Sequence, residues 1–382
     1  MVMEAYDRLK LLTSQMHLEP AEDSNCPQLS SRKQDKFNVS DAVLPNGKRI
    51  MLLKSQLSTV CERNCYYCPF RAGRDFQRAT FKPDEFAKVF MALYHARIAE
   101  GIFLSSGIVN NGIFTQDMLI NTADILRNKL SYRGYIHLKI MPGAEFDQVA
   151  RAMQLADRVS INLEAPTTER LEKLAPRKHF IEELLQPLQW IQQIRQNLSP
   201  KKGWNAHWPS SVTQFVVSAV GETDLELMTT TEYLYTKLHL KRAYYSSFNP
   251  ISDTPLENIP PGSPVREHRL YEASFLLRDY GFSIEELPFN PDGHLPLDVD
   301  PKYAWAKKNL LENPVEINRA DLHMLLRVPG IGPKIAKSII ETRLKQKVNQ
   351  PEELSLFGIN LKRAAPFILI NGKSPPYQTS FL

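Results

Sequence analysis

The sequence of 382 residues predicts an α/β fold, a partial (β/α)6 TIM-like barrel with a small all-α helix-hairpin-helix domain at the C-terminus. Three observations lead to this fold. Short apolar runs alternate with stretches of helical spacing, a proline-rich segment precedes a basic one, and a Gly-Ile-Gly turn divides helical spacing inside that basic segment.

Six short apolar runs are candidate strands, at residues 50–53, 102–104, 136–141, 159–163, 215–217 and 243–248. The segments between them, such as 84–99, 117–130 and 181–194, carry apolar residues at helical spacing. Alternating strands and helices predict a parallel sheet with right-handed crossovers. Because a complete eightfold barrel needs two more units, the sequence favours a partial barrel of six.

Proline clusters set the expected domain boundaries. The barrel is expected to span residues 46–287, with a helix at 266–281 closing the sheet. A linker at 288–301 then leads to the C-terminal domain at 302–382. Residues 1–45 show no clear pattern, and we expect them to form a cap or to pack on the barrel.

Composition and charge limit the classes of function. The chain has no run of about 18 apolar residues and no signal-peptide core, so we expect a soluble, cytoplasmic protein that does not enter membranes. Residues 301–382 contain 13 Lys and Arg against 6 Asp and Glu, a net charge of +7, whereas the preceding residues carry −2. The C-terminal region is therefore the part expected to face a polyanion.

Three of the four cysteines, Cys61, Cys65 and Cys68, follow the first candidate strand closely. Such clustering does not fit the disulfide framework of a small secreted protein. Three thiolates can bind three irons of a 4Fe-4S cluster and leave the fourth iron open, as a catalytic cluster requires. The alternative is a zinc site with Cys26 as fourth ligand, although structural zinc usually takes its cysteines in Cys-x2-Cys pairs.

The spacing Cys-x3-Cys-x2-Cys, with Tyr67 before the last cysteine, is similar to the motif of the radical S-adenosyl-L-methionine (SAM) superfamily. The chain also resembles one family within it, DNA modification or repair proteins encoded beside a uracil-DNA-glycosylase-like partner. The stretches that carry this resemblance are residues 52–75, 101–107, 137–143, 159–166, 244–248 and 300–306. The resemblance implies the partial barrel, a 4Fe-4S cluster with Cys61, Cys65 and Cys68 as ligands, SAM as cofactor, and an electron donor.

The resemblance also assigns cofactor-binding residues. Ser105, Ser106 and Gly107 end the second strand where superfamily members present a Gly-Gly-Glu-like turn to the methionine amino group. The glutamate is missing here, so main-chain carbonyls and the serine hydroxyls are expected to replace it. Tyr67, beside the last cysteine, is expected to contact the cofactor as well.

Polar residues on three later strands complete the expected cofactor site. Asn162 and Glu164 alternate along the fourth strand, so both should point into the barrel, as candidates for the ribose hydroxyls and the methionine end. Lys139 and Gln214 are placed similarly on strands three and five. Each of the four could instead satisfy a hydrogen bond inside the barrel.

Three arginines after the cysteines, Arg71, Arg74 and Arg78, have two open interpretations. They could bind substrate phosphates, or they could pair with the acidic residues nearby.

Helical apolar spacing on both sides of Gly330-Ile331-Gly332 predicts a helix-hairpin-helix. Both glycines are expected to permit the tight turn, and the amides that start the next helix can hold a phosphate, with Lys334 and Lys337 beside them. A weaker copy at residues 352–364 has Asn360 in the second glycine position, and asparagine tolerates a left-handed conformation, so a second hairpin is compatible with this sequence. The alternative is a protein-docking or structural module.

The leading hypothesis is an enzyme that cleaves SAM to a 5′-deoxyadenosyl radical and modifies or repairs nucleic acid, with DNA favoured. A second hypothesis is radical modification of RNA or of a partner protein, with the hairpins as a tether. A third is a non-catalytic iron-sulfur scaffold that binds DNA and recruits a glycosylase.

Overall fold

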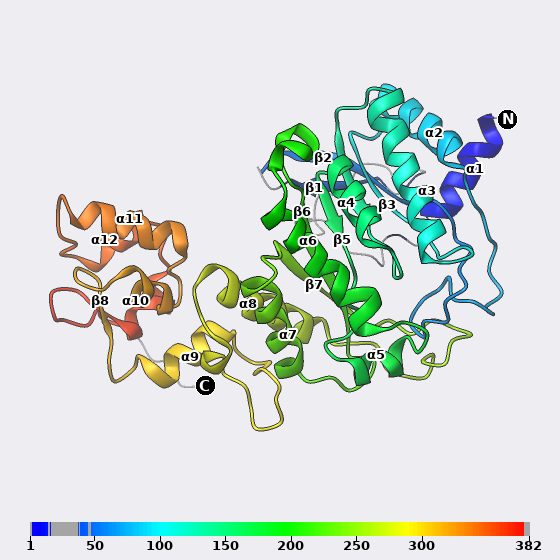
Figure 1. The fold of residues 1–382 in the computed structure, drawn as a ribbon. Helices are drawn as coiled ribbons and strands as arrows, with labels where there is room; N and C mark the ends of the chain where they lie inside the picture. The colour runs from blue at the N-terminus through cyan, green and yellow to red at the C-terminus, as the bar shows by residue number, and fades with distance from the viewer. Residues whose placement is uncertain (1, 14–15, 17–36, 38, 45–46, 378–382) are drawn as a thin grey trace. The chain divides into compact units, whose positions relative to one another are not determined.

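The computed structural model describes residues 2–13, 16, 37, 39–44 and 47–377 (Figure 1). The chain divides into two compact units. The first comprises residues 1–222 and 236–262, and the second comprises residues 223–235 and 263–382. Each unit is described by itself below.

The first unit is built on a seven-stranded sheet whose strands lie side by side in chain order. Its strands are β1 (Val39–Val43), β2 (Arg49–Gln56), β3 (Gly101–Ser105), β4 (Tyr135–Lys139), β5 (Arg158–Ser160), β6 (Ser210–Val217) and β7 (Arg242–Ser247). Strand β1 pairs with β2 in antiparallel fashion, and every later pair is parallel. The carboxyl ends of β2 to β7 therefore meet at one edge, where an α/β sheet presents its ligands.

The first unit also contains helices, of which α1 precedes the sheet in the chain and the others connect its parallel strands. They are α1 (Val2–Thr13), α2 (Pro83–His95), α3 (Gly112–Asp124) with its extension η3 (Ile125–Lys129), α4 (Phe146–Leu155), α5 (Thr168–Leu174), η4 (Phe180–Leu185), α6 (Gln186–Asn197), η5 (Pro200–Lys202) and η6 (Trp204–Ala206). Figure 1 shows α2, α3, α4 and α6 packed in sequence along the sheet. Their starts follow local chemistry: Pro83 occupies the first turn of α2, and Asn111 caps α3 by accepting from the Phe114 amide at 2.7 Å.

The predicted fold class is confirmed. All six expected strands are present within the sheet, and each parallel pair is joined through helical connections. Two details differ from the expectation. The fourth predicted strand is shorter, because β5 ends at Ser160. The antiparallel strand β1 adds a seventh strand from a segment expected to form a cap or to pack on the barrel.

The second unit is mostly helical. Its elements are α7 (Asp224–Thr236), α8 (Pro264–Asp279), η7 (Ile284–Glu286), α9 (Pro301–Asn309), β8 (Val315–Glu316), α10 (Leu322–Arg327), α11 (Pro333–Arg343), α12 (Pro351–Leu356), α13 (Leu361–Ala364), η8 (Ala365–Phe367) and β9 (Ile368–Leu369). Helices α9 to α13 share one apolar core, which includes the fully buried Ile331, Ile339 and Phe367. No described helix has the length and apolar character that crossing a membrane requires.

The compact units differ from the expected boundaries. Helix α8, expected to close the barrel sheet, clusters with the second unit, and so do residues 288–301, expected to be a linker. The fully buried Asp224 explains this grouping. Its carboxylate accepts from Arg266 of α8 at 2.7 Å and from the Leu295 amide at 2.9 Å. One buried carboxylate thus ties α7, α8 and the 288–301 segment together.

Candidate functional site

The three cysteines lie on the loop of residues 57–82 between β2 and α2. The two ends of this loop are pinned, because the Phe81 amide donates to the Leu57 carbonyl at 2.9 Å and the Leu57 amide donates to Ser105 of β3 at 2.8 Å. Arg78 organises the middle by donating to the main-chain carbonyls of Thr59, Phe70, Arg71 and Arg74. The cysteine loop is therefore held against the carboxyl end of β3.

The contacts of Arg74 and Arg78 differ from the pairing with nearby acidic residues that was one of their two interpretations. Arg74 donates to the carbonyls of Pro69 at 2.9 Å and Ser252 at 3.0 Å. Both side chains thus donate to main-chain carbonyls, which need hydrogen-bond donors when they are buried. Arg71 lies over the Tyr66 ring, with 5.5 Å between the guanidinium carbon and the ring centroid. These arginines shape the loop.

Cys61, Cys65 and Cys68 all line a single pocket. Burial raises the pKa of the Cys65 and Cys68 thiols. The Ile108 amide donates to Cys61 Sγ at 3.4 Å, a type of contact that tunes the potential of sulfur-bound metal centres. Cys65 and Cys68 are thus desolvated, and Cys61 already receives an N–H group from the protein.

Gly107 has a steric reason to be glycine. A Cβ atom at this position would lie 2.3 Å from the Val60 carbonyl oxygen and 3.1 Å from Cys61 Cβ. Any larger residue would push the end of β3 away from the cysteine loop. The close approach of these two segments explains a glycine at the end of the Ser105-Ser106-Gly107 turn.

The other residues predicted to bind the cofactor line the same pocket as the cysteines. They are Tyr67, Ser105, Ser106, Gly107, Lys139, Asn162, Glu164 and Gln214. They come from the cysteine loop, from the end of β3 and the residues after it, from β4 and β6, and from the segment that follows β5. Asn162 and Glu164 lie beyond the end of β5 rather than within a strand. Asn162 Nδ2 donates to Gln214 Oε1 at 3.3 Å.

Glu164 is held in an unusual backbone conformation. Its φ is +66°, in the left-handed region that costs a non-glycine residue free energy and is often found at functional sites. Strand β6 stabilises it, since the Glu164 amide donates to the Gln214 carbonyl at 2.9 Å and the Val216 amide donates to the Glu164 carbonyl at 2.8 Å. The carboxylate is thereby directed into the pocket.

A buried ion pair between Glu164 and Lys178 completes this part of the pocket. Lys178 is not among the residues predicted from the sequence. Lys178 Nζ lies 3.0 Å from Glu164 Oε1, and both side chains are less than 10% exposed. Burial raises the pKa of the nearby Tyr67 hydroxyl well above its usual range, and the Glu164 carboxylate adds to this effect. Lys178 follows the short helix α5 instead of a strand, so neither periodicity nor strand position indicates it.

Lys139 is the second lysine of the pocket. Burial lowers the pKa of its ammonium group to about 7, although Glu164 acts in the opposite direction. At neutral pH this amine can therefore give up or accept a proton, unlike a lysine on the surface.

The first hairpin of the second unit joins α10 to α11. Gly330 has a φ of +87°, so the turn requires glycine there. Gly332 has φ −97° and ψ 174°, ordinary extended backbone, and a Cβ atom there would meet only Tyr280 Oη at 3.4 Å. This corrects the expectation that both glycines are needed for the turn. The absence of a side chain at Gly332 leaves the start of α11 open instead.

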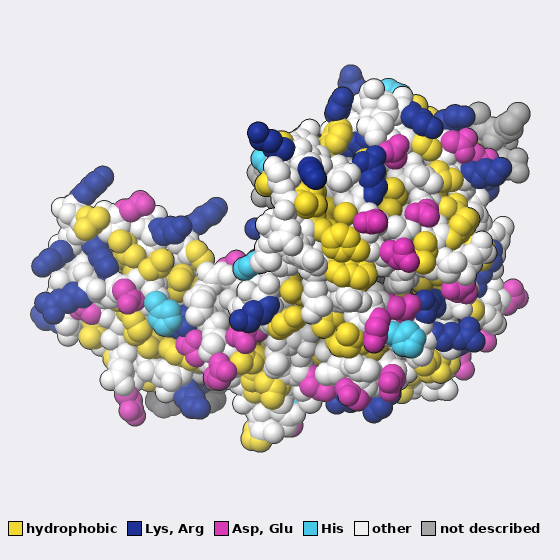
Figure 2. Space-filling view, in the orientation of Figure 1, with side chains coloured by type: hydrophobic (Ala, Val, Ile, Leu, Met, Phe, Trp, Pro, Cys, Tyr) yellow, Lys and Arg dark blue, Asp and Glu magenta, His cyan; other side chains and the backbone are white. Residues whose placement is uncertain are grey.

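The hairpin turn is braced from outside the motif. Ile331 is fully buried, and its carbonyl accepts a hydrogen bond from Lys302 Nζ of α9 at 2.6 Å. Burial lowers the pKa of Lys302 to about 7. Lys334 and Lys337, in contrast, are exposed on α11. Figure 2 shows Lys and Arg side chains on the surface around α11 and α12.

The second hairpin joins α12 to α13 and repeats the first with one difference. Gly358 takes the left-handed conformation, with φ +82°, whereas Asn360 has φ −76° and ψ 98°. Asn360 therefore does not use the left-handed conformation that asparagine tolerates, because this position is the N-cap of α13, as Gly332 is of α11. The buried Ile359 corresponds to Ile331.

Comparison with known families agrees with this geometry. Residues 55–199, which include the cysteine loop and β3 to β5, match the Radical SAM superfamily. The chain carries a radical SAM domain. Residues 312–358 match the helix-hairpin-helix motif. A comparison with curated proteins finds no match.

Several solved structures are similar to the radical SAM domain, at low identity. Methylornithine synthase is 16% identical with a TM-score of 0.47, over 60% of this chain and 63% of that one. The FeFe-hydrogenase maturase HydG from Carboxydothermus hydrogenoformans is 16% identical with a TM-score of 0.44, over 59% and 51%. A radical SAM methyltransferase from Sphaerobacter thermophilus is 13% identical with a TM-score of 0.45, over 64% and 73%. The chain spans less than two thirds of the first two of these proteins.

The cofactors of a radical SAM domain are a 4Fe-4S cluster and SAM. The pocket fits them, because three buried or half-buried thiols share it with hydroxyl, amide, carboxylate and ammonium groups. Within the described parts of the chain, no three His, Cys, Asp or Glu side chains converge on one metal ion. Cysteines that bind a cubane each bind a separate iron, so their sulfurs need not converge. Cys26 lies outside the described residues.

Asn162 allows a test of the SAM-binding role that separates it from folding. Asn162→Ala should weaken SAM binding roughly five- to tenfold, the effect of one lost hydrogen bond, and leave the melting temperature unchanged, since the side chain is only half-buried. Calorimetric titration of the reconstituted protein with SAM measures this. Asn128→Ala, an exposed asparagine paired with Asp124, is the matched control. Equal affinities for wild type and Asn162→Ala would make Asn162 a structural residue.

Proposed function

We propose that this protein is a radical SAM enzyme that modifies or repairs nucleic acid, with DNA as its substrate. The observation that carries the proposal is the shared pocket, where the three cysteines meet polar side chains from four strand ends. The helix-hairpin-helix motif and the +7 charge of residues 301–382 support a nucleic-acid substrate.

The proposal gives each group of residues a role. Cys61, Cys65 and Cys68 hold the cluster, and the polar side chains from Ser105 to Gln214 hold SAM. When bound and reduced, this pair supplies a 5′-deoxyadenosyl radical that abstracts hydrogen from the substrate. The Glu164–Lys178 ion pair fixes the pocket wall, and Lys139 can transfer a proton to or from the substrate.

In the C-terminal domain, the turn Gly330-Ile331-Gly332 and the start of α11 bind backbone phosphates, with Lys334 and Lys337 beside them. Two protein partners belong to the proposal. An electron donor must reduce the cluster. A uracil-DNA-glycosylase-like protein is the expected partner in DNA repair. A reducing compartment such as the cytoplasm suits the three thiols.

Two other functions remain distinguishable by experiment. Radical modification of RNA or of a partner protein would keep SAM cleavage, but DNA would not stimulate it. A non-catalytic DNA-binding scaffold would hold the cluster without cleaving SAM.

Isotope transfer tests the proposed substrate. Reduced protein is incubated anaerobically with SAM and deuterated DNA oligonucleotides, and the 5′-deoxyadenosine is analysed by mass spectrometry. Hydrogen abstraction from DNA predicts deuterium in the 5′-deoxyadenosine. Deuterium from RNA alone, or from neither nucleic acid despite turnover, would reject DNA as the substrate.

The hairpin makes a separate prediction about DNA affinity. Gly332→Val should weaken binding to duplex DNA at least tenfold, because a branched side chain covers the helix start while the extended backbone tolerates it. Log affinity of the wild type should fall with log salt at a slope of roughly −2 to −4. Fluorescence anisotropy measures both, with Ser338→Val, an exposed site on the same helix, as the control. Matching curves for wild type and Gly332→Val would show that this hairpin does not bind DNA.

A further inference from the structure

Leu356 is a strongly exposed apolar residue of the hairpin domain. It is the last residue of α12 and is 86% exposed, although most apolar side chains of α10 to α13 are buried in a common core or packed against it. Val328, at the corresponding position of the first hairpin, is fully buried. A single exposed leucine is common on protein surfaces, so its position must decide whether it has a role.

Leu356 lies at the turn end of the domain. In a helix-hairpin-helix, the first helix runs toward the turn, and α12 ends at Leu356, two residues before the left-handed Gly358. The two hairpin turns pack against each other, because a Cβ atom on Gly330 would lie 3.7 Å from the Asn360 carbonyl oxygen and 4.0 Å from Ile359 Cγ2. Leu356 therefore belongs to the same edge as the start of α11.

This edge is basic. Lys334 and Lys362 each occupy the second position of the helix after a turn, one per hairpin, and both are exposed. Phosphates drawn to these lysines bring a nucleic acid against the edge on which Leu356 stands. An apolar side chain among phosphate-binding groups has a nucleotide base as its natural partner, because apolar wedges inserted at base steps are a recurrent means of binding DNA.

We propose that Leu356 is a wedge that enters the nucleic acid at an unstacked base, so the domain prefers duplexes that contain a bulged or mismatched base. This inference rests on the proposed function, since it requires the hairpins to bind nucleic acid. Opening a paired, stacked step opposes insertion, whereas a bulge has already lost that stacking. Burying one leucine side chain at a bulge corresponds to roughly a tenfold gain in affinity over the paired duplex.

A matched leucine provides the control. Leu344 is 82% exposed and lies just after the end of α11, about 16 Å along the helix from its start. Leu356→Ala and Leu344→Ala remove the same number of atoms from equally exposed sites, so neither should change folding. Only Leu356 lies at the turn edge.

Binding of the full chain to a paired duplex and to the same duplex with one bulged base tests the wedge. Wild type and Leu344→Ala should prefer the bulged probe roughly tenfold, and Leu356→Ala should bind both probes equally. A 2-aminopurine beside the bulge should change its fluorescence with wild type and not with Leu356→Ala. Retained preference in Leu356→Ala, or no preference in wild type, overturns the wedge. Gly332→Val distinguishes failure of the wedge from failure of the proposed function. Unchanged DNA binding in that variant rejects the hairpin as the DNA-binding element.

Discussion

Alanine in place of Cys61, Cys65 or Cys68 is expected to abolish the iron-sulfur cluster. In the proposed site each of the three sulfurs would hold one iron of the cluster, and two remaining sulfurs would not suffice for a stable cluster. Wild type reconstituted under anaerobic conditions should contain about four irons and four sulfides per chain, and each variant should contain little of either. Iron and sulfide analysis together with the visible absorption spectrum measures the loss.

Cys26→Ala is the control for the cysteine series. It should keep the cluster, because the three-cysteine motif does not include it. Loss of iron in Cys26→Ala would show that the ligand set is wrong. One zinc per chain without iron-sulfur absorbance in anoxic wild type would reject the cluster itself.

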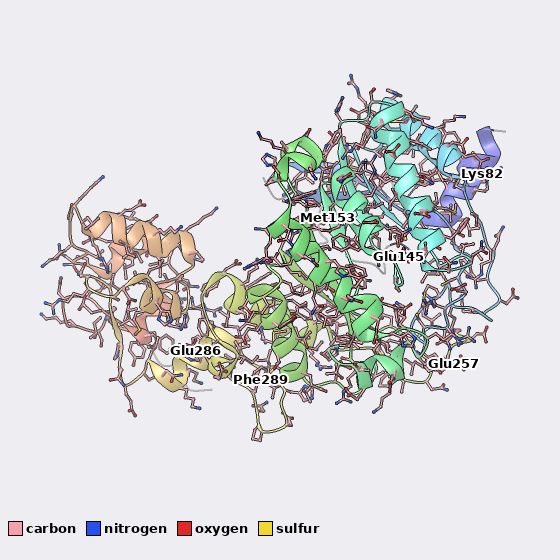
Figure 3. All side chains as sticks on the ribbon, in the orientation of Figure 1. Lys82, Glu145, Met153, Glu257, Glu286 and Phe289 are labelled. Atoms are coloured by element: carbon pink, nitrogen blue, oxygen red, sulfur yellow. The ribbon has the colours of Figure 1, made fainter. Side chains whose placement is uncertain are left out.

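Removal of Arg327 is expected to destabilise the hairpin unit by about 2–3 kcal/mol, because its part-buried acceptors lose a charged donor. The Arg327 side chain is 1% exposed and pairs with Glu286, which is 30% exposed, at 2.8 Å. Glu286 is labelled in Figure 3. It also donates to the carbonyls of Tyr280 and Gly281 at 2.9 Å, and it lies 3.8 Å from the Phe282 ring centroid. This one guanidinium joins α10 to the segment that follows α8.

Arg327→Met keeps the apolar contacts and removes every one of these hydrogen bonds, so Glu286 and two carbonyls lose their partner. Calorimetric unfolding of the full chain measures the destabilisation. Arg363→Met is the matched control, because Arg363 is 47% exposed and its ion pair with Asp300 should contribute less than about 1 kcal/mol. Similar unfolding of Arg327→Met and wild type would show that the guanidinium network does not hold the unit together.

The sheet could be predicted from sequence because its strands are buried on both faces. Phe103 of β3 and Leu138 of β4, for example, are fully buried. Strands of this kind consist of continuous apolar runs, which differ from the helical spacing of the segments between them. Strand β1 could not be predicted, because the sequence Val39–Val43 has polar residues at its centre and pairs through its backbone with β2. Hydrogen bonds between main chains do not require a recognisable pattern of apolar and polar side chains.

The pocket residues that could be predicted from the sequence are those on the barrel strands and those in the Cys-x3-Cys-x2-Cys motif. The carboxyl ends of parallel strands meet, so Lys139 and Gln214 could be placed together from strand positions alone. Lys178 could not, since it reaches Glu164 from a loop after α5. The same limit applies to Lys302 and Arg327, whose partners lie 29 and 41 residues away in the chain.

Cleavage of SAM by the reduced protein tests the radical SAM assignment most directly. Reconstituted wild type, reduced without oxygen and given SAM, should release 5′-deoxyadenosine and methionine in equal amounts, and faster when DNA is present. Cys68→Ala should release neither. Chromatography with mass detection measures both products. A wild-type protein that carries a complete cluster, binds SAM and releases no 5′-deoxyadenosine with any reductant, with or without DNA, would contradict radical SAM catalysis by this protein.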